Sequence, residues 1–569
     1  MINSRLDAPT ASLFKLTALA AGLGALAAGA AWVLLRLIAI ITNLALLHTL
    51  SSELPPSSAF TRSPTIVIAA VSGAFVVSLL ALWCPVIRGH GIPEAMEAVL
   101  TRQSCISPRA AVAKPLSSAI AIGVGGPFGA EGPIIVTGGA IGSLLGQILP
   151  VTPSERKILL CSGAAAGMAA TFGAPIAAVV LAVELLLFEF SLRSLLPLLV
   201  ATSIAGGLHA ALFGSGPLFE MPAHEFYGLE TLPLFALLGL ACGLLASVIS
   251  RGLFLVEAGF RRLPVPEFWH PVIGAVGFAT VGLVVPGALG VGYDEISDVL
   301  NGRLATATVI ALLVAKLLAW WIALGSGTSG GTLAPLLLIS GCFGTLFGVV
   351  VTDLLPSTQT SVSAFALVAM AATFGAATRT PLTSIVFVFE LTQDYQAVLP
   401  LMGATVIAVL VTQMLMRDSL MTEKLTRRGI LVHNTYDVDP ASITRVSDVM
   451  SSPVQTLPAT ATIRDAVAAI TTGGHAAYPL VDDSRCCVGI VSRSDLAGLD
   501  DDHDEDLPVL EIASRDIVTI QPTATIKDAQ GRIILESVDH LPVVDDDGKL
   551  VGMCTRTDIL RTNSRRLSP

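Results

Sequence analysis

Long uncharged stretches follow one another through the first three quarters of this chain. They span residues 17–35, 63–87, 132–154, 194–219, 271–293, 317–352 and 398–416. Each approaches or exceeds the roughly 20 residues that a membrane-spanning helix needs. Several are too long, or too often interrupted by glycine and proline, for one straight helix. The pattern therefore predicts an all-α polytopic membrane domain with broken helices.

The pattern turns polar after residue 416. Basic residues follow the last apolar stretch, at Arg417, Lys424, Arg427 and Arg428. Because positive charge gathers on the cytoplasmic side of membrane helices, we expect the C-terminal region in the cytoplasm. We assign residues 1–430 to the membrane domain and residues 431–445 to a linker.

An internal repeat occupies the polar tail. Six residues recur 63 positions later: Thr462, Asp465, Pro479, Gly489, Arg493 and Asp495 as Thr525, Asp528, Pro542, Gly552, Arg556 and Asp558. Short apolar strands alternate with helical patterns in both copies, so each is expected to form one α/β unit. The predicted copies are residues 446–499 and 509–563. An acidic linker at 500–508 separates them, and residues 564–569 form a tail.

Composition agrees with a membrane protein and narrows the partners. The chain is 53% hydrophobic and 13% charged, with a mean hydropathy of +0.75, whereas soluble domains average about 25% charged residues. A formal charge of -10 argues against a nucleic-acid partner, which would require a basic surface. The eight cysteines form no CxxC pair, so neither a disulfide framework nor a metal site is predicted.

The membrane part carries a weaker repeat. The segment 169–174, followed by Pro175 and then Glu184, is echoed by 371–376, Pro381 and Glu390. Duplication in a helical membrane protein commonly means two halves of inverted topology with a binding site where they meet. A chance match between alanine-rich helices is the alternative.

Three glycine and proline clusters interrupt the apolar sequence. Their members are Gly89, His90, Gly91, Ile92 and Pro93; Gly129, Ala130, Glu131, Gly132 and Pro133; and the segment 327–335, which ends in Gly331, Thr332, Leu333, Ala334 and Pro335. In each cluster proline precedes an apolar helical run, as expected for a helix that begins inside the membrane. Irregular backbone at that depth must be satisfied by protein or by a polar cavity. Glycines used only for close packing are the alternative.

The first turn of such a helix presents unpaired N–H groups and a partial positive charge, so converging helix starts make an anion site. Each start contributes only about 0.3 to 2 kcal/mol, so a dehydrated anion needs several together. Glu131 lies inside the second cluster, where an ionisable group is expensive unless it is functional. We expect its carboxylate to occupy the anion's place and to leave when protonated, which makes Glu131 a gate.

These residues resemble the CLC family of chloride channels and chloride/proton exchangers, whose signatures are GSGIP, GREGP and GxFxP, with paired CBS domains in many tails. The resemblance extends from about residue 13 to 561. It implies a homodimer with one pore per subunit in a bacterial-type inner (plasma) membrane, chloride as the transported anion, and protons as a further partner. By this resemblance Glu131 matches the external gating glutamate, Lys114 matches the lysine beneath the pathway, and Met421 lies where a tyrosine usually closes the inner side.

Departures from the family pattern are informative. His90 stands at the central-site serine, Ala130 at the arginine of GREGP, and Leu333 at the phenylalanine of GxFxP. Leu185 occupies the position of the internal proton acceptor, next to Glu184. The loss of that acid and of the inner tyrosine favours passive or weakly proton-coupled conduction. A chloride/proton antiporter and a fluoride-selective exporter remain alternatives.

His90 could compensate for the absent hydroxyls. An imidazole has an unperturbed pKa of about 6.5, and a cation about 4 Å from an anion gains roughly 4 kcal/mol at an effective dielectric constant of 20. A protonated His90 would make permeation acid-stimulated. The alternative is a neutral imidazole turned away from the pore and hydrogen-bonded to backbone.

Each tail repeat ends in a hydroxyl residue three positions before an aspartate: Ser492 with Asp495, and Thr555 with Asp558. In CBS pairs that are similar, the hydroxyl contacts phosphate and the aspartate holds the ribose of an adenine nucleotide (ATP, ADP or AMP). The alternative is that these side chains only cap the following helices. No cofactor is required by either reading.

Other classes of protein fit less well. A CBS-regulated divalent cation transporter would need acidic residues along its pore, and Glu131, Glu184 and Glu390 are few. A non-conducting membrane sensor has no evident use for Glu131 and Lys114. An enzyme is not expected, because no nucleophile and base pair or phosphate-binding P-loop is visible in the sequence.

Overall fold

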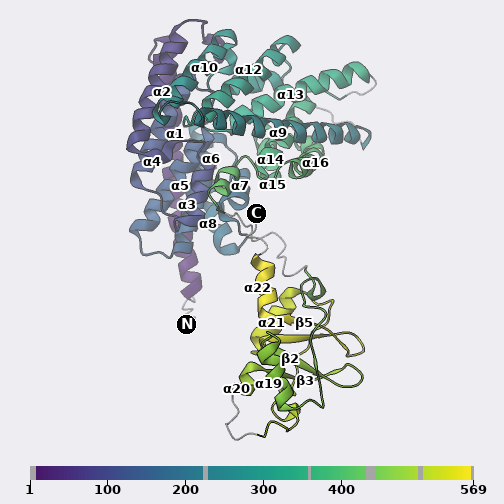
Figure 1. The fold of residues 1–569 in the computed structure, drawn as a ribbon. Coiled ribbons are helices and arrows are strands. Elements are labelled where there is room, and N and C mark those ends of the chain that lie inside the picture. The colour runs from purple at the N-terminus through teal and green to yellow at the C-terminus, as the bar shows by residue number, and fades with distance from the viewer. Residues whose placement is uncertain (1–7, 222–228, 357–359, 431–443, 498–503, 565–569) are drawn as a thin grey trace, which may run out of the picture. The chain divides into compact units, whose positions relative to one another are not determined.

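The computed structural model describes residues 8–221, 229–356, 360–430, 444–497 and 504–564. The chain divides into two compact units, residues 1–434 and residues 435–569 (Figure 1). Most of the predicted linker 431–445, part of the acidic linker 500–508 and nearly all of the tail 564–569 lie outside the described residues.

The first unit is helical throughout its described part. Its first half holds α1 (Ala8–Thr42), α2 (Thr65–Trp83), α3 (Ile92–Thr101), α4 (Pro108–Gly123), α5 (Glu131–Ile148), α6 (Pro153–Phe172), α7 (Pro175–Ala182) and α8 (Leu192–Phe213). Its second half holds α9 (Leu232–Arg261), α10 (His270–Val284), α11 (Tyr293–Leu300), α12 (Thr306–Gly325), α13 (Leu333–Leu354), α14 (Val362–Thr378), α15 (Pro381–Thr392), α16 (Val398–Leu415) and the short α17 (Glu423–Arg427).

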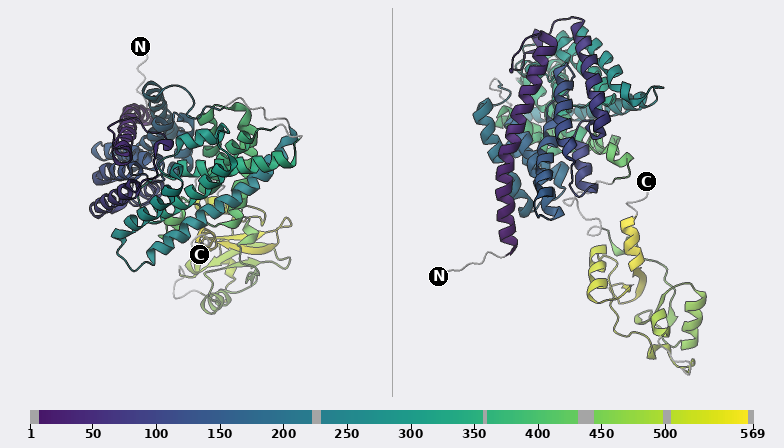
Figure 2. Two further views of the ribbon diagram at one scale, coloured as in Figure 1. Left: turned by 90° about the horizontal axis from the view of Figure 1, so that it is seen from above. Right: turned by 90° about the vertical axis from the view of Figure 1, so that its left-hand side faces the viewer.

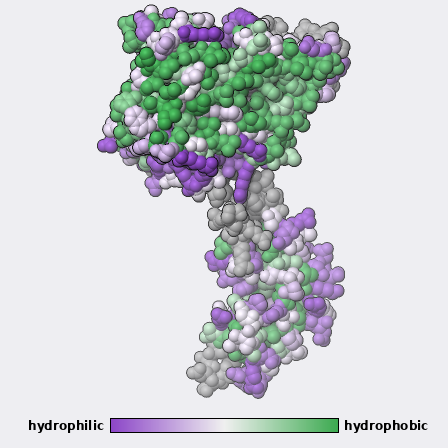
Figure 3. Space-filling view, turned by 45° about the horizontal axis from the view of Figure 1, so that its top comes forward, coloured by the Kyte–Doolittle hydropathy of each residue, from purple (hydrophilic) through white to green (hydrophobic). Residues whose placement is uncertain are grey.

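Eight helices of the described part are long and apolar enough to cross a membrane. Much of their apolar surface faces outward, and Figure 3 shows a broad hydrophobic face on this unit with hydrophilic residues gathered at its two ends. This arrangement confirms the predicted polytopic, all-α membrane domain. α1 runs the height of the unit from the N-terminal side (Figure 2).

The two halves pack in corresponding ways. α5 packs on α6 and α6 on α8 in the first half, while α13 packs on α14 and α14 on α16 in the second. α7 and α15, the helices that follow the repeated alanine-rich segments, contact each other.

Short helices such as α3, α7 and α11 produce the predicted interruptions. Gly91 precedes α3 with a φ of 98°, and Gly292 precedes α11 with a φ of 86°, backbone conformations that favour glycine. The uncharged stretch 271–293 is divided in the structure, because α10 ends at Val284 and α11 begins separately at Tyr293. α3, α5 and α13 also begin one or two residues before the proline of their cluster.

The second unit contains two α/β copies, as predicted. The first has β1 (Leu457–Pro458), α19 (Ile463–Thr472), β2 (Ala477–Val481), β3 (Cys487–Ser492) and α20 (Arg493–Ala497). The second has α21 (Ile526–Leu535), β4 (His540–Val544), β5 (Leu550–Thr555) and α22 (Arg556–Ser564). β1 pairs parallel with β2, and the pairs β2–β3 and β4–β5 are antiparallel. The register repeats, with Pro479 opposite Ile490 and Pro542 opposite Met553.

The two copies complete each other's cores. Val446, which precedes the first copy, is fully buried in the core of the second, whereas Val509, which precedes the second copy, is fully buried in the core of the first. The backbone follows this exchange, because Val446 N–H donates to Ala524 O and Val509 N–H donates to Ala461 O. Neither copy therefore has a complete core by itself.

Candidate functional site

The three glycine clusters meet in the interior of the first unit. Gly89 pairs with Ser329 in a parallel bridge, and Gly129 pairs with Gly331 in an antiparallel one. In the second bridge Gly129 N–H donates to Gly331 O at 3.2 Å and Gly331 N–H donates to Gly129 O at 2.9 Å. Segments some 200 residues apart in the chain are thus joined at the starts of α5 and α13.

Glycine is required where these backbones touch. A Cβ on Gly91 would lie 2.6 Å from Gly132 O, and a Cβ on Gly132 would overlap the carbonyl oxygen of His90 and lie 3.3 Å from Gly331 Cα. Side chains at these positions would force the starts of α3, α5 and α13 apart. The close approach explains why glycine recurs in all three clusters.

The predicted anion-site residues are all buried. This holds for Gly89, His90, Gly91, Ile92, Pro93, Gly129, Ala130, Gly132, Pro133, Gly331, Thr332, Leu333, Ala334, Pro335 and Met421. Three helix starts therefore present first-turn peptide N–H groups inside the protein, where their partial positive charge acts in a medium of low dielectric constant.

Glu131 lies at this meeting point and is 1% exposed. Its Oε1 accepts a hydrogen bond from Ala334 N–H at the start of α13. Its Oε2 has no hydrogen-bond partner among the described residues. The carboxylate thus uses a peptide N–H group that could otherwise hold an anion.

Lys114 holds the backbone that leads into the start of α3. Its ammonium group, buried with the side chain, donates to Ile87 O at 2.8 Å and to Gly89 O at 2.7 Å. It fixes the loop that carries His90 and brings a positive charge close to the helix start.

Two residues beside α3 were not predicted. Glu94 Oε2 accepts a hydrogen bond from Gly91 N–H at 2.7 Å, and Lys424 Nζ lies 3.2 Å from the position of a Cβ on Gly89. The acid at the third position of the helix is a capping signal that the sequence did contain. Lys424 comes from α17, so only the fold could reveal its position.

His90 is 1% exposed, and its Nδ1 has no hydrogen-bond partner among the described residues. The predicted alternative, in which backbone holds the imidazole, is therefore not seen at Nδ1. Protonation would add a positive charge beside the buried Lys114 and the half-buried Lys424, which is electrostatically unfavourable. The neutral ring still offers an N–H donor at the position where the family resemblance implies a serine hydroxyl.

Met421 and Leu185 are two further positions at which the sequence departs from the family pattern. Met421 is fully buried and supplies no hydroxyl, while Leu420 N–H beside it donates to Ala377 O at 2.9 Å. Leu185 is 4% exposed and packs in the apolar core. The described structure thus offers no acid at position 185 and no phenol at position 421.

Glu184 and Glu390 bind the starts of each other's helices. Glu184 accepts hydrogen bonds from Leu382 N–H at 3.2 Å and Thr383 N–H at 2.9 Å at the start of α15. Glu390 accepts from Ile176 N–H at 3.0 Å and Ala177 N–H at 2.7 Å at the start of α7. These contacts give both acids a structural role.

A fourth helix start, that of α11, was not predicted from the sequence. Gly89, Gly91 and Glu94 recur 201 positions later as Gly290, Gly292 and Glu295, just before and within α11. Lys316 of α12 donates to Gly290 O at 2.8 Å, just as Lys114 of α4 donates to Gly89 O. The equal spacing was the signal that could have found it.

In the tail, the predicted nucleotide residues cap helices. Ser492 Oγ and N–H both donate to Asp495 Oδ2 at 2.7 Å, and Thr555 Oγ1 donates to Asp558 Oδ2 at 2.7 Å. Thr555 lines a cleft of about 110 Å³ between the copies, together with Ser451, Gln455, His475 and His540. Ligand pockets are usually about 300–1,000 Å³, so this cleft must widen to admit a nucleotide.

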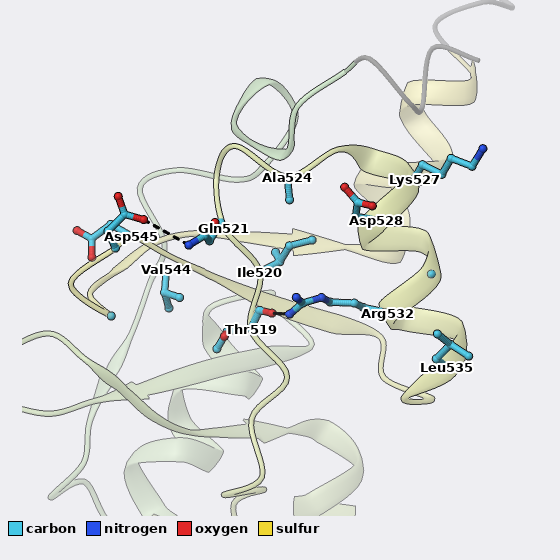
Figure 4. A pocket seen from close by; sticks show the side chains of 13 residues that line it. Thr519, Ile520, Gln521, Ala524, Lys527, Asp528, Arg532, Leu535, Val544 and Asp545 are labelled. Carbon is cyan, nitrogen blue, oxygen red and sulfur yellow. Dashed lines mark hydrogen bonds between the residues drawn. The ribbon is translucent and has the colours of Figure 1, made fainter. Parts of the chain in front are cut away.

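A larger pocket of about 860 Å³ lies on the second copy (Figure 4). It is bordered by Thr519 to Gln521, by α21 from Lys527 to its end at Leu535, and by the hairpin between β4 and β5. Gln521 Nε2 donates to Asp546 Oδ1 at 3.3 Å, and Arg532 donates to Thr519 O. Acidic and basic side chains mix along it, so its charge favours no single class of ligand. In the described part of the chain no three His, Cys, Asp or Glu residues gather as a metal site would require.

Comparisons with known proteins agree with this geometry. The family model described as "Voltage gated chloride channel" matches residues 72–413, and the CBS domain model matches residues 446–501 and 509–564. The H(+)/Cl(-) exchange transporter ClcA of Vibrio campbellii is 32% identical over 63% of this chain and 77% of its own length. The chloride channel protein CLC-f of Arabidopsis thaliana is 27% identical over 88% of this chain and 63% of its own length.

Solved structures share the fold. A slow cyanobacterial Cl⁻/H⁺ antiporter superposes with a TM-score of 0.64 at 25% identity, covering 73% of this chain and 97% of that structure. A eukaryotic CLC transporter gives 0.62 at 18% identity, covering 96% and 98%. These matches, together with the convergent helix starts around Glu131, establish that the chain belongs to the CLC family of voltage-gated chloride channels and related transporters and carries a CBS pair in its tail.

Proposed function

We propose that this protein transports chloride through the meeting point of α3, α5 and α13, with Glu131 as the gate. The hydrogen bond from Ala334 N–H to Glu131 carries the proposal, because it shows a negative group held at a helix start within the protein. A chloride ion at the same place would meet the same peptide dipole. The relationship to chloride-transporting members of the family supports chloride as the anion.

Proton coupling is proposed to be weak or absent. Glu131 can carry a proton to and from one side, but Leu185 offers no acid to pass it onward. Met421 gives no hydroxyl to close the inner end. Each departure loosens the link between anion and proton movement.

The test uses purified protein in liposomes with chloride efflux and proton uptake recorded together. We expect chloride flux with little proton movement against a gradient. Glu131→Gln, which mimics the protonated acid, should conduct without any dependence on external pH, whereas Glu53→Gln, an exposed acid, should behave as the unmodified protein. Proton uptake that is tightly proportional to chloride efflux would reject weak coupling, and absence of chloride flux would reject the function itself.

Proton-coupled exchange is the second candidate, and the similarity to named chloride/proton exchangers favours it. Fluoride export has less support, because the CLC-type fluoride/proton antiporter is 21% identical and shows the fold alone. A divalent cation transporter is disfavoured by the geometry, since Glu184 and Glu390 are engaged with helix starts. A non-conducting sensor would leave the gate position of Glu131 without a use.

We further propose a homodimer in a plasma membrane, with the tail in the cytoplasm, as the basic residues that follow the last apolar stretch indicate. Light scattering on detergent-solubilised protein measures the first, and protease access in oriented vesicles measures the second.

Regulation by adenine nucleotide at the CBS pair is the last part of the proposal. Ser492, Asp495, Thr555 and Asp558 would contact phosphate and ribose once the cleft widens. Calorimetric titration of the purified protein with ATP, ADP and AMP tests it. If none of the three nucleotides releases or absorbs heat, these side chains only cap their helices.

A further inference from the structure

Tyr293, the first residue of α11, carries a buried polar atom that has no part in the site described above. Its ring lies edge-on to Phe172 and Phe219, with ring centroids 6.3 Å and 6.2 Å away. The hydroxyl oxygen is buried and has no hydrogen-bond partner among the described residues. Because the large majority of buried hydroxyl groups in proteins are hydrogen-bonded, this one calls for a partner.

Glu131 is a polar side chain near the Tyr293 hydroxyl. The two groups interact electrostatically, although they belong to different helices, α5 and α11. Phe172, which packs against the Tyr293 ring, ends α6, and α6 packs along α5. The phenol is therefore held close to the gate by apolar rings that offer it no hydrogen bond of their own.

Tyr293 also borders a space that opens to the surface. It lines a pocket of about 530 Å³ whose rim includes Ser52 and Glu53, both of them exposed. The end of α1 and the end of α8 form the other walls of this pocket. Tyr293 thus lies both near the gate and along a pocket that solvent can enter.

The hydrogen bonds that Glu131 can make depend on its protonation. In the structure its Oε1 accepts from Ala334 N–H at the start of α13. A neutral carboxylic acid gains less from the positive helix start, and its own O–H needs an acceptor. The phenol of Tyr293 can accept that bond and can donate its own O–H to the other carboxyl oxygen. Chloride can then bind the peptide N–H group that the acid has left.

We propose that Tyr293 is a positioning residue for the gate: when Glu131 is protonated and leaves the start of α13, its carboxyl group forms a hydrogen bond with the Tyr293 hydroxyl. The inference rests on the proposed function and names the residue that holds the gate in its open position. Because Tyr293 stabilises the neutral acid outside the anion site, it raises the external pH at which chloride can pass.

Other titratable groups surround this pair, and the test must separate their effects from that of Glu131. They are Lys316 of α12, which faces Glu131, Asp294 and Glu295 of α11, His90 before α3, and the pocket residues Arg36, Glu53 and His209. Tyr293→Phe leaves all of them in place. An acid response that comes from one of them alone persists in Glu131→Ala.

The test measures chloride efflux from liposomes against external pH for the unmodified full-length protein, Tyr293→Phe, Glu131→Ala and the double variant. We expect Tyr293→Phe to lower the half-activating external pH by about 0.5–1 unit, the size of one neutral hydrogen bond, and to keep the flux reached at low pH. Glu131→Ala has no carboxyl to hold, so adding Tyr293→Phe to it should change nothing. Tyr395→Phe, which removes a hydroxyl from a side chain that is 79% exposed, is the matched control.

An unchanged half-activating pH in Tyr293→Phe would overturn this role and leave the proposed function standing. A loss of flux of equal size with and without the Glu131 carboxyl would also overturn it, because Tyr293 would then serve packing alone. Absence of chloride flux in the unmodified protein, or a flux that does not respond to external pH, would instead refute the proposed function. Thermal unfolding midpoints of the four proteins check that each is folded.

Discussion

Gly132→Ala should separate the helix starts at the anion site. The added methyl group would overlap His90 O and lie 3.3 Å from Gly331 Cα. Real Cβ atoms essentially never approach other atoms closer than 3.0 Å, so α5 must move away from α3 by about 1 Å. Such overpacking destabilises a protein by about 1–3 kcal/mol.

Transport should suffer more than stability. One helix start contributes about 0.3 to 2 kcal/mol to anion binding, which corresponds to as much as about thirtyfold in affinity if α5 no longer points at the site. We therefore expect chloride flux to fall about tenfold or more while the protein remains folded. Gly139→Ala, one position on the same helix with ordinary contacts of 3.5 Å to Ala164 and 3.6 Å to Leu160, is the matched control.

The assay is chloride efflux from liposomes at equal protein content, with the thermal unfolding midpoint measured on the same preparations. Gly139→Ala should keep full flux and be as stable as the unmodified protein, because alanine favours a helix interior. Equal flux in Gly132→Ala and Gly139→Ala would refute the view that these backbones must touch for an anion to pass.

Three further outcomes follow from the geometry. Glu390→Gln weakens two hydrogen bonds to the start of α7 and should lower stability by about 0.5–2 kcal/mol in thermal unfolding, while the exposed Glu267→Gln should lower it little. Hydrogen bonds from the Thr525 hydroxyl and N–H hold the pKa of the Asp528 carboxyl below its usual range. The tail should therefore keep this stabilisation down to about pH 4 and lose it as the pH falls further, through the lowered pKa of Asp528. Asp528→Asn has no carboxyl to protonate, so its stability in urea unfolding should not show this fall with pH. His90→Ser should leave the dependence of chloride flux on internal pH unchanged, because the imidazole is neutral; loss of acid stimulation would show that it is protonated.

Local sequence signals were enough to predict the helix starts that the structure brings together. Glycine, proline and a lone Glu131 inside apolar sequence are unusual at membrane depth, so they identified the helix starts before any fold was available. Their convergence needed the structure, because the bridge between Gly129 and Gly331 joins distant segments. The role of Lys424 beside Gly89 was invisible for the same reason.

Exact helix boundaries and long-range partners were beyond what single stretches of sequence could predict. In the uncharged run 271–293, Pro286, Gly287, Gly290 and Gly292 signal an interruption, and the structure places it between the end of α10 at Val284 and the start of α11 at Tyr293. Glu184 stood out in the sequence by its repeat with Glu390 and its place beside Leu185, but its hydrogen-bond partners, Leu382 and Thr383, lie about 200 residues away. Contacts of that range follow from the fold and not from spacing.

The exchange of carboxylates between α7 and α15 bears on how the chain is synthesised. Ile176 leaves the ribosome 214 residues before its partner Glu390, so the start of α7 enters the bilayer with peptide groups that nothing yet binds. The first half cannot reach its final form until translation of the second is nearly complete. A chain cut between α8 and α9 should accordingly yield two fragments that are degraded when made separately and that reassemble when made together.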